Sequence, residues 1–256
     1  MRALAEAVAR EAGAQLRAAF RGPGVDVSAK STPTDLVSEA DRAAERLIRE
    51  RLLAERPGDA ILGEEGGDAA GTSGLRWVVD PLDGTTNFLF GIPQWAVSIA
   101  CEDGDGALAG VVYDPVHDEL WAAERDGAAT LNGRAFEAPG RGDLATALVA
   151  TGFGYDAGAR AAQAEVLQRV LPRVRDIRRA GSAALDLVWT AAGRVDAYYE
   201  WGVQPWDLAA GELVCRRAGL QVRRLEPLAP PTGGGVLVAP PALVEPLLRL
   251  IGVPVG

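Results

Sequence analysis

The chain has 256 residues, of which 24% are charged and 48% hydrophobic, and its formal net charge is −9 at pH 7. This balance is typical of a folded globular protein and disfavours non-specific binding to nucleic acid, whose phosphates attract basic surfaces. The two cysteines fit no metal-binding spacing, and a chain of this length needs no disulfide to fold. A reducing cytoplasm is therefore the expected setting.

No signal peptide or membrane span is expected. Charged residues interrupt the apolar residues of the first 20 positions, and nowhere do 18 apolar residues follow one another. No break in composition and no long Pro, Ser or Gly tract divides the chain, so a single domain over residues 1–256 is the simplest interpretation. Two tightly joined subdomains, roughly 1–140 and 141–256, are compatible with it.

The predicted elements begin with an amphipathic helix over Leu4–Phe20, where apolar residues recur at three- and four-residue steps. A second helix starts after Ser38, which can cap it, carries Asp41 in its first turn and ends at Pro57-Gly58. Short apolar runs then predict strands, and Asp-Gly pairs at 103–106 predict a hairpin turn. These strands are expected at Ala60–Leu62, Trp77–Asp80, Trp95–Cys101, Leu108–Tyr113 and Glu119–Ala123.

Helices and strands alternate in the second half of the chain, a pattern that is typical of helices layered on sheets. The helices are expected near Ala161–Leu171, Ala183–Gly193 and Leu208–Ala218. The strands are expected near Val174–Ile177, Val195–Glu200, Leu220–Leu225 and Gly235–Ala239. The whole pattern predicts an α/β layered fold.

An acidic loop, DPLDGTTNF, begins where the predicted Trp77 strand ends, and open sheets commonly bind ligands at that end of their strands. Asp80 and Asp83 supply carboxylates, and Leu82 supplies a backbone carbonyl. Gly84 lets the backbone approach an anion, and the amides of Gly84, Thr85 and Thr86 can meet phosphate oxygens if a helical turn begins there. The loop can therefore hold a metal ion and a phosphate together, although a single Asp-Gly is usually a plain surface turn.

Two further acidic positions stand in comparable places. Glu64 follows the short strand Ala60–Leu62, and Asp207 lies at the start of a predicted helix. Judged alone, Glu64 belongs to a solvated pair of acids and Asp207 is an acid favoured by the helix macrodipole. Beside the Asp80 loop they complete a set of hard oxygen ligands of the kind that Mg²⁺ prefers. Metal-assisted phosphate chemistry is the leading hypothesis.

Four segments extend this pattern: GEE at 63–65, WVVDPLDGTTNF at 77–88, RRAGSAALDLVWTAAGRVDAYYE at 178–200 and GVQPWDLAAG at 202–211. Together they resemble the inositol monophosphatase family, specifically its bacterial members, from about Lys30 to Gly219. The resemblance implies a five-layer αβαβα sandwich of the inositol monophosphatase and fructose-1,6-bisphosphatase type, two to three Mg²⁺ ions, lithium sensitivity and a homodimer. It also implies hydrolysis of a phosphate monoester, with myo-inositol monophosphate as the leading substrate.

The resemblance further implies a set of metal ligands. Glu64, Asp80 and the Leu82 carbonyl match the ligands of a first ion, and Asp80, Asp83 and Asp207 match those of a second. A weaker third ion depends on Glu64, which is expected to be catalytic as well as a ligand.

The remaining roles follow from the same resemblance. Thr85 and Asp41 match a pair that orients the attacking water, and the amides of Gly84 and Thr85 match phosphate donors. Ala183 and Glu200 match residues that contact the substrate, as Asp83 also does.

Several alternatives stay open at this point. Fructose 1,6-bisphosphate, histidinol phosphate and nucleotide 3′-phosphates compete with inositol phosphates as substrates, and a regulatory binding protein that retains the metal site is an alternative of another class. A haloacid dehalogenase-type phosphatase is disfavoured, because its nucleophile lies in an Asp-x-Asp-Gly-Thr pattern whereas the spacing here is Asp-x-x-Asp, with no lysine downstream. Lys30, the only lysine, could meet phosphate or solvent, and His117, the only histidine, is expected in a surface turn.

Overall fold

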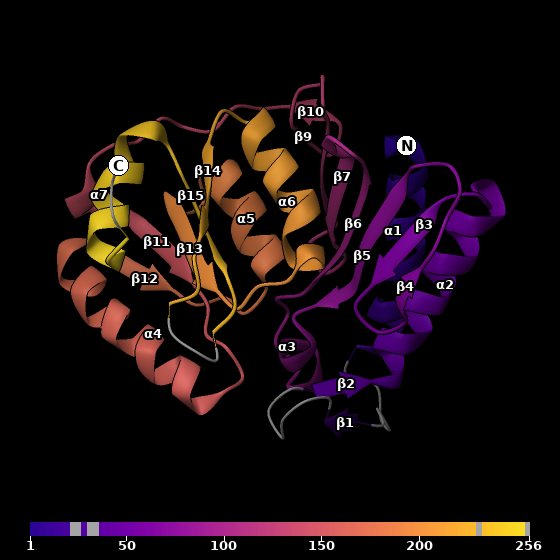
Figure 1. Cartoon of the computed structure of the whole chain (residues 1–256), viewed down its shortest axis with the longest axis horizontal. Coiled ribbons are helices and arrows are strands. Elements are labelled where there is room, and N and C mark those ends of the chain that lie inside the picture. Colours follow the sequence, from indigo (N-terminus) through magenta and orange to yellow (C-terminus); the bar gives the residue numbers. More distant parts are fainter. Residues whose placement is uncertain (21–26, 30–35, 229–231, 254–256) are drawn as a thin grey trace.

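Two large β-sheets alternate with three layers of helices in the computed structural model, which describes residues 1–20, 27–29, 36–228 and 232–253 (Figure 1). One pair of helices covers the outer face of the first sheet, a second pair lies between the sheets, and a third covers the outer face of the second sheet. The predicted five-layer αβαβα sandwich is confirmed. From the first layer to the last, the helices are α1 (Arg2–Ala19) and α2 (Glu39–Glu55), α5 (Ala183–Ala191) and α6 (Pro205–Arg217), and α4 (Ala157–Val170) and α7 (Pro241–Ile251).

The first sheet has the strand order β10-β9-β8-β7-β6-β5-β3-β4. Only β3 and β5 pair in parallel, and the other neighbours in this sheet are antiparallel. Every strand predicted in this half is present, although β5 continues past its predicted end at Asp80 to Asp83. The strands are β3 (Ala60–Gly63), β4 (Gly67–Ala69), β5 (Arg76–Asp83), β6 (Ala96–Asp103), β7 (Gly106–Asp114), β8 (Glu119–Glu124), β9 (Thr130–Leu131) and β10 (Arg134–Ala135).

The second sheet has the order β12-β11-β13-β15-β14. Strand β11, which was not predicted, pairs in parallel with β12 and β13, whereas β15 is antiparallel to β13 and β14. A small antiparallel pair, β1 (Val27–Ala29) with β2 (Leu36–Ser38), and a short helix α3 (Thr85–Leu89) complete the elements near the first sheet. The strands of the second sheet are β11 (Leu148–Thr151), β12 (Asp176–Arg178), β13 (Ala197–Trp201), β14 (Gln221–Leu225) and β15 (Gly235–Ala239), and short 3₁₀ turns occur at Leu144–Thr146 and Leu171–Arg173.

Helices cover both faces of each sheet, and this explains why the central strands are almost continuously apolar. Trp77 and Trp95 are buried beneath α1 and α2, and Trp121 is buried beneath the central helices. The ring of Phe88, the last residue of the acidic loop, lies 5.2 Å from that of Trp95 and 5.4 Å from that of Phe20. The apolar core therefore anchors the far end of the acidic loop.

Three helices differ from the sequence-based expectation, and the first is α4, which begins at Ala157 rather than near Ala161. Helix α6 begins at Pro205 rather than at Leu208, so Asp207 lies within its first turn. Helix α7 was not among the predicted elements. No helix in the described ranges is long and apolar enough to cross a membrane. The division into subdomains at about residue 140 stays a prediction.

Candidate active site and metal centre

A cavity of about 370 Å³ opens where residues of both sheets meet the first turns of α5 and α6. Strand β5 lines it from the first sheet, and β13 lines it from the second. With the exception of Asp41, every site residue predicted from the sequence lines this cavity: Glu64, Asp80, Leu82, Asp83, Gly84, Thr85, Ala183, Glu200 and Asp207.

Three carboxylates converge within the cavity. One oxygen from each of Asp80, Asp83 and Asp207 lies within 4.8 Å of the others. Side chains three residues apart on a regular strand point to opposite faces, but the register of β5 with β6 shifts between Asp80 and Asp83. The irregularity allows both side chains to meet Asp207 on one side of the sheet.

The carboxylates in this cluster repel one another when they are ionised. Burial, followed by the charges of Glu64, Asp83 and Asp207, raises the pKa of Asp80 well above its ordinary value. Burial likewise raises the pKa of Asp207, and that of Asp83 to about 6. A divalent cation would remove this repulsion and supply the missing counter-charge. Clustered oxygen donors with raised pKa values therefore fit a hard cation such as Mg²⁺.

Neighbouring groups fix the direction of all three carboxylates, and Oδ1 of Asp80 accepts from the amide of Leu82 at 2.9 Å. Oδ2 of Asp83 accepts hydrogen bonds from the Ser182 hydroxyl and the Ala184 amide, both at 2.6 Å. Oδ2 of Asp207 accepts from the amide of Gln204 at 2.7 Å as part of a capping box at the start of α6. In each case one oxygen is held by the protein, which leaves the other for a ligand.

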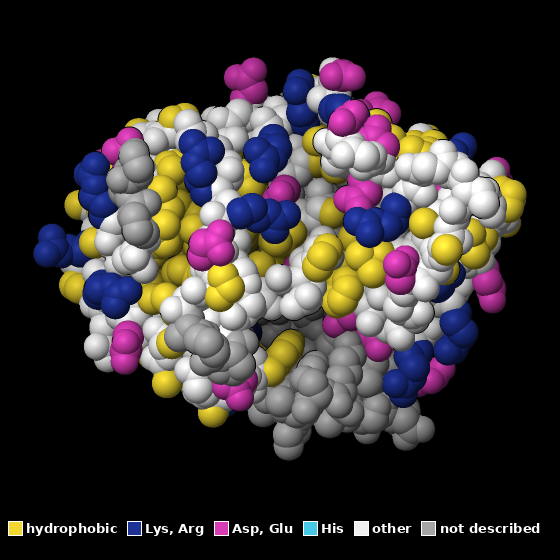
Figure 2. Space-filling view, viewed as in Figure 1, with side chains coloured by type: hydrophobic (Ala, Val, Ile, Leu, Met, Phe, Trp, Pro, Cys, Tyr) yellow, Lys and Arg dark blue, Asp and Glu magenta, His cyan; other side chains and the backbone are white. Residues whose placement is uncertain are grey.

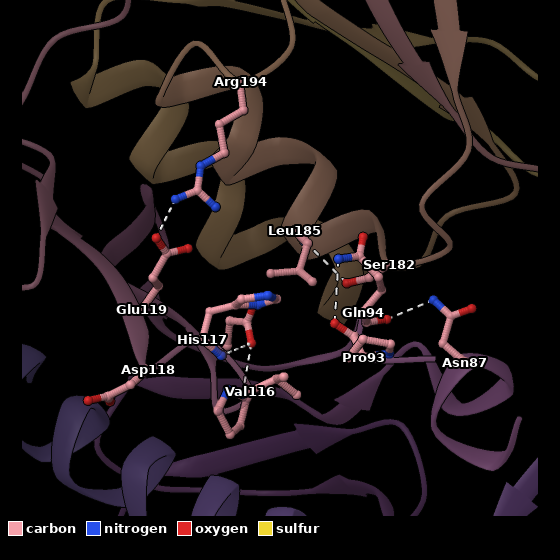
Figure 3. Close-up of polar contacts among 12 residues, drawn as sticks. Asn87, Pro93, Gln94, Val116, His117, Asp118, Glu119, Ser182, Leu185 and Arg194 are labelled. Carbon is pink, nitrogen blue, oxygen red and sulfur yellow. Dashed lines mark hydrogen bonds and ion pairs between the residues drawn. The ribbon is translucent and has the colours of Figure 1, made fainter. Parts of the chain in front are cut away.

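Asn87 joins the two walls of the cavity. Its side-chain amide donates to the carbonyls of Gln94 and Ala180, at 2.7 and 2.8 Å. Figure 3 shows Asn87 pointing toward Gln94, and Ser182 capping α5 by accepting from the Leu185 amide. These contacts fix the segment before α5, and with it the hydroxyl that bonds to the acidic cluster.

Thr85 and Asp41 form a buried pair below the acidic loop. The Thr85 hydroxyl donates to Oδ1 of Asp41 at 2.7 Å, with the Leu82 carbonyl 3.1 Å away. Gly84 precedes α3 with φ of 104°, a left-handed conformation, and an added Cβ there would lie 2.9 Å from the Gln94 carbonyl. Asp41 is not among the described lining residues, but it accepts this hydrogen bond from Thr85, which does line the cavity.

Three further residues that line the cavity are Ala183, Glu200 and Arg179. Oε2 of Glu200 accepts from the Tyr198 hydroxyl at 2.8 Å. Burial raises the pKa of Glu200 to about 7, opposed by that hydroxyl and by the charge of Arg179. A Cβ on Gly152 would overlap the Glu200 carboxylate, so glycine is needed there. The cavity therefore offers both an acceptor, Glu200, and a cationic donor, Arg179.

Three contributors to the site, Ser182, Arg179 and Tyr198, were not predicted. The sequence could have predicted Ser182 as the N-cap residue of α5, because serine is favoured at that position. Its hydrogen bond to Asp83 depends on the tertiary fold and could not have been predicted. His117 lies in a turn as predicted, with Nδ1 2.8 Å from Asp114, and is not among the described cavity residues. Lys30 lies outside the described residues.

Comparison with known proteins agrees with this geometry. The family model described as "Inositol monophosphatase family" matches residues 1–251. The chain belongs to the inositol monophosphatase family. It is 45% identical to a Mycobacterium tuberculosis protein named inositol-1-monophosphatase SuhB, over 98% of this chain and 93% of the relative. The predicted family is therefore confirmed.

Two further relatives place that similarity in context. A Salmonella typhimurium protein named Nus factor SuhB is 40% identical over 86% of this chain and 83% of its own length. The crystal structure of the extragenic suppressor protein suhB from Bartonella henselae superposes with a TM-score of 0.90 at 38% identity, covering 98% of each chain. The layered fold is thus shared with solved members of the family.

Proposed function

We propose that this chain is a Mg²⁺-dependent phosphatase that hydrolyses a small phosphate monoester, with myo-inositol monophosphate as the leading substrate. The observation that carries the proposal is the convergence of oxygens from Asp80, Asp83 and Asp207 within 4.8 Å. Two to three Mg²⁺ ions, when bound, would neutralise the phosphate, lower the pKa of a bound water and stabilise the leaving alkoxide. The protein then needs no covalent phosphoenzyme.

The acidic residues divide the work of holding these ions. Glu64, Asp80 and the Leu82 carbonyl are proposed to hold the first ion, and Asp80, Asp83 and Asp207 the second. The Leu82 carbonyl has two lone pairs, so it can serve an ion even while the Thr85 hydroxyl is nearby. Glu64 is also proposed to support a weaker third ion.

Thr85 is proposed to orient the water that attacks phosphorus. Because its hydroxyl proton is directed to Asp41, the lone pairs of its oxygen remain to accept a hydrogen bond from a water molecule, and a proton taken from that water would be matched by transfer of the hydroxyl proton to Asp41. Positioned acceptors of this kind contribute about 10²–10⁴-fold to the rate of a reaction. The backbone amides of Gly84 and Thr85 are proposed to donate to the phosphate oxygens.

Glu200 and Arg179 are proposed to recognise the alcohol part of the substrate. Glu200 can accept hydrogen bonds from hydroxyl groups, whereas the Arg179 guanidinium can only donate them. A polyol satisfies both, because each hydroxyl is a donor and an acceptor. Ala183, with its small side chain, and Asp83 complete the proposed contacts. This chemistry supports a polyol phosphate such as inositol phosphate as the substrate.

A second candidate function is a regulatory binding protein that retains the metal site. This candidate is retained because the Salmonella relative is named Nus factor SuhB and not inositol-1-monophosphatase. On the face shown in Figure 2, basic and acidic side chains are interspersed rather than gathered into one patch of a single charge. A homodimer and sensitivity to lithium are further proposals that rest on family membership, and a cytoplasmic location is proposed from the use of only two cysteines.

A phosphate-release assay separates the two candidates. The purified chain is given inositol 1-phosphate, fructose 1,6-bisphosphate, histidinol phosphate and a nucleotide 3′-phosphate, each with Mg²⁺, with chelator, and with Mg²⁺ plus lithium. We expect Mg²⁺-dependent release that is fastest for inositol phosphate. Asp105→Asn, in an exposed hairpin turn, is the matched control for substitutions in the acidic cluster. A folded chain that releases no phosphate from any of these esters would refute the phosphatase proposal.

A further inference from the structure

We propose that Glu45 is a positioning residue for Glu64, because it holds the turn that presents this ligand to the metal centre. The inference rests on the proposed function. Glu45 lies on α2, it is 2% exposed, and it is not among the described residues that line the cavity. Any effect of Glu45 on the metal centre is therefore transmitted through the chain that it contacts.

The Glu45 carboxylate binds the backbone immediately after Glu64. Oε2 accepts from the amide of Glu65 at 2.7 Å, and Oε1 accepts from the amide of Gly66 at 2.8 Å. Two successive amides that converge on one anion form a concave binding nest. On the other side, the amide of Glu64 donates to the carbonyl of Val79 on β5 at 3.3 Å. The backbone at Glu64 is therefore held from both directions.

Two glycines leave the space that this carboxylate occupies. A Cβ built on Gly63 would lie 2.3 Å from Oε1 of Glu45, and one built on Gly66 would lie 2.5 Å from the same atom. Any side chain at either position would push the carboxylate away from the two amides. The Gly-Glu-Glu-Gly sequence thus supplies the proposed metal ligand, Glu64, together with the amides and the space that accommodate the Glu45 carboxylate.

Arg49 supplies the counter-charge that the buried carboxylate needs. Its Nη1 lies 3.1 Å from Oε1 of Glu45, one helical turn further along α2, and also donates to the carbonyl of Gly67 at 3.3 Å. A buried charge is costly unless it is paired and hydrogen-bonded, and Glu45 meets both conditions. The turn is held by charge-assisted bonds, which are stronger than neutral ones.

Helix α2 therefore supports two parts of the site at once. Asp41 and Glu45 are four residues apart, so they share one face of the helix. Asp41 accepts from Thr85 beside the acidic loop, and Glu45 accepts from the turn after β3. One rigid element thus sets the position of Thr85 relative to Glu64.

The test compares Glu45→Gln with Glu50→Gln, the same change at an exposed position on the same helix. Glutamine has nearly the size of glutamate, but its NH₂ group cannot accept, so at least one of the two amide bonds is lost. Removing a partner that orients a metal ligand typically costs 10–100-fold in metal affinity or activity. We expect calorimetric titration to show Mg²⁺ binding weakened by about 10–100-fold in Glu45→Gln. The Mg²⁺ concentration for half-maximal phosphate release should rise by the same factor.

The outcomes separate this inference from the proposed function. If the unaltered chain binds no Mg²⁺ and releases no phosphate, the proposed function fails. If the unaltered chain does both and Glu45→Gln binds Mg²⁺ within twofold of it, the positioning role is wrong, even where the melting temperature falls. If Glu45→Gln does not fold, Gly66→Ala replaces it: the added Cβ should displace the carboxylate and weaken Mg²⁺ binding similarly, and unchanged binding would overturn the inference.

Discussion

The Thr85 hydroxyl donates a 2.7 Å hydrogen bond to Asp41, joining the acidic loop to a helix residue 44 positions earlier in the chain. Both side chains are buried, at 7% and 1% exposure. The bond fixes which way the hydroxyl proton points, and therefore which lone pairs of the Thr85 oxygen remain available. The Thr85→Ala and Thr85→Ser variants test this relationship.

Thr85→Ala should lower kcat by about 10²–10⁴-fold, the usual contribution of a positioned proton-transfer partner. Thr85→Ser keeps the hydroxyl and its bond to Asp41, so it should retain most of the activity. Both rates are measured by phosphate release at saturating Mg²⁺. If the alanine variant were as active as the serine variant, the Thr85 hydroxyl would have no role in the reaction.

Asp83→Asn should lower phosphate release by at least about 100-fold, because it removes one charge that would face the cations and the developing charge of the transition state. The amide oxygen can still accept from Ser182 and Ala184, so the fold should persist. Circular dichroism and a melting curve check the fold. Turnover close to that of the Asp105→Asn control would refute the metal-ligand assignment.

Mg²⁺ should raise the melting temperature of the chain, because it binds the folded state and relieves repulsion among the buried carboxylates. At 100 times the dissociation constant, such binding contributes about 2.7 kcal/mol of stability. For a chain of this size that corresponds to a shift of about 5–10 °C. A melting temperature that does not change between chelator and saturating Mg²⁺ would count against the site.

The stability of the chelated protein should fall as the pH rises above about 4. The pKa of Asp83 is about 6 in the fold, against an ordinary value of 3.8, and those of Asp80 and Asp207 are also raised. Between pH 3.8 and about pH 6 the folded state therefore binds more protons at Asp83 than the unfolded chain does, so rising pH favours unfolding. We expect chelated Asp83→Asn to lose less stability than the parent between pH 5 and pH 7.5. Identical losses in the two proteins would contradict the raised pKa of Asp83.

Local patterns in the sequence predict most of the elements and the acidic loop, whereas Ala183 and Glu200 were expected only from the resemblance to the family. The apolar run Trp77-Val78-Val79 ends in Asp80, so a strand leading into an acidic loop follows from neighbouring residues alone. The register shift between Asp80 and Asp83 does not, because it depends on pairing with β6. It is this shift that brings Asp207 within reach of both.

Other features depend on contacts between distant segments. Helix α7 contains Pro246, which normally argues against a helix interior, but burial of Leu243, Leu247 and Ile251 stabilises the helix in spite of it. The role of Glu45 is equally invisible along the chain, because its partners lie 20 and 21 residues away. An acid on an amphipathic helix is normally expected to face solvent. The contact of Glu45 with the Gly-Glu-Glu-Gly turn is seen only in the folded structure, where Gly63 and Gly66 leave space for its carboxylate.

The most direct measurement is a crystal of this chain soaked in Mn²⁺, an anomalously scattering substitute for Mg²⁺, with data collected at the manganese edge. The account predicts at least two anomalous peaks in the cavity, one within bonding distance of Glu64 and Asp80 and another within bonding distance of Asp80, Asp83 and Asp207. A map with no peak among these carboxylates at saturating Mn²⁺, or with peaks only elsewhere on the surface, would contradict it.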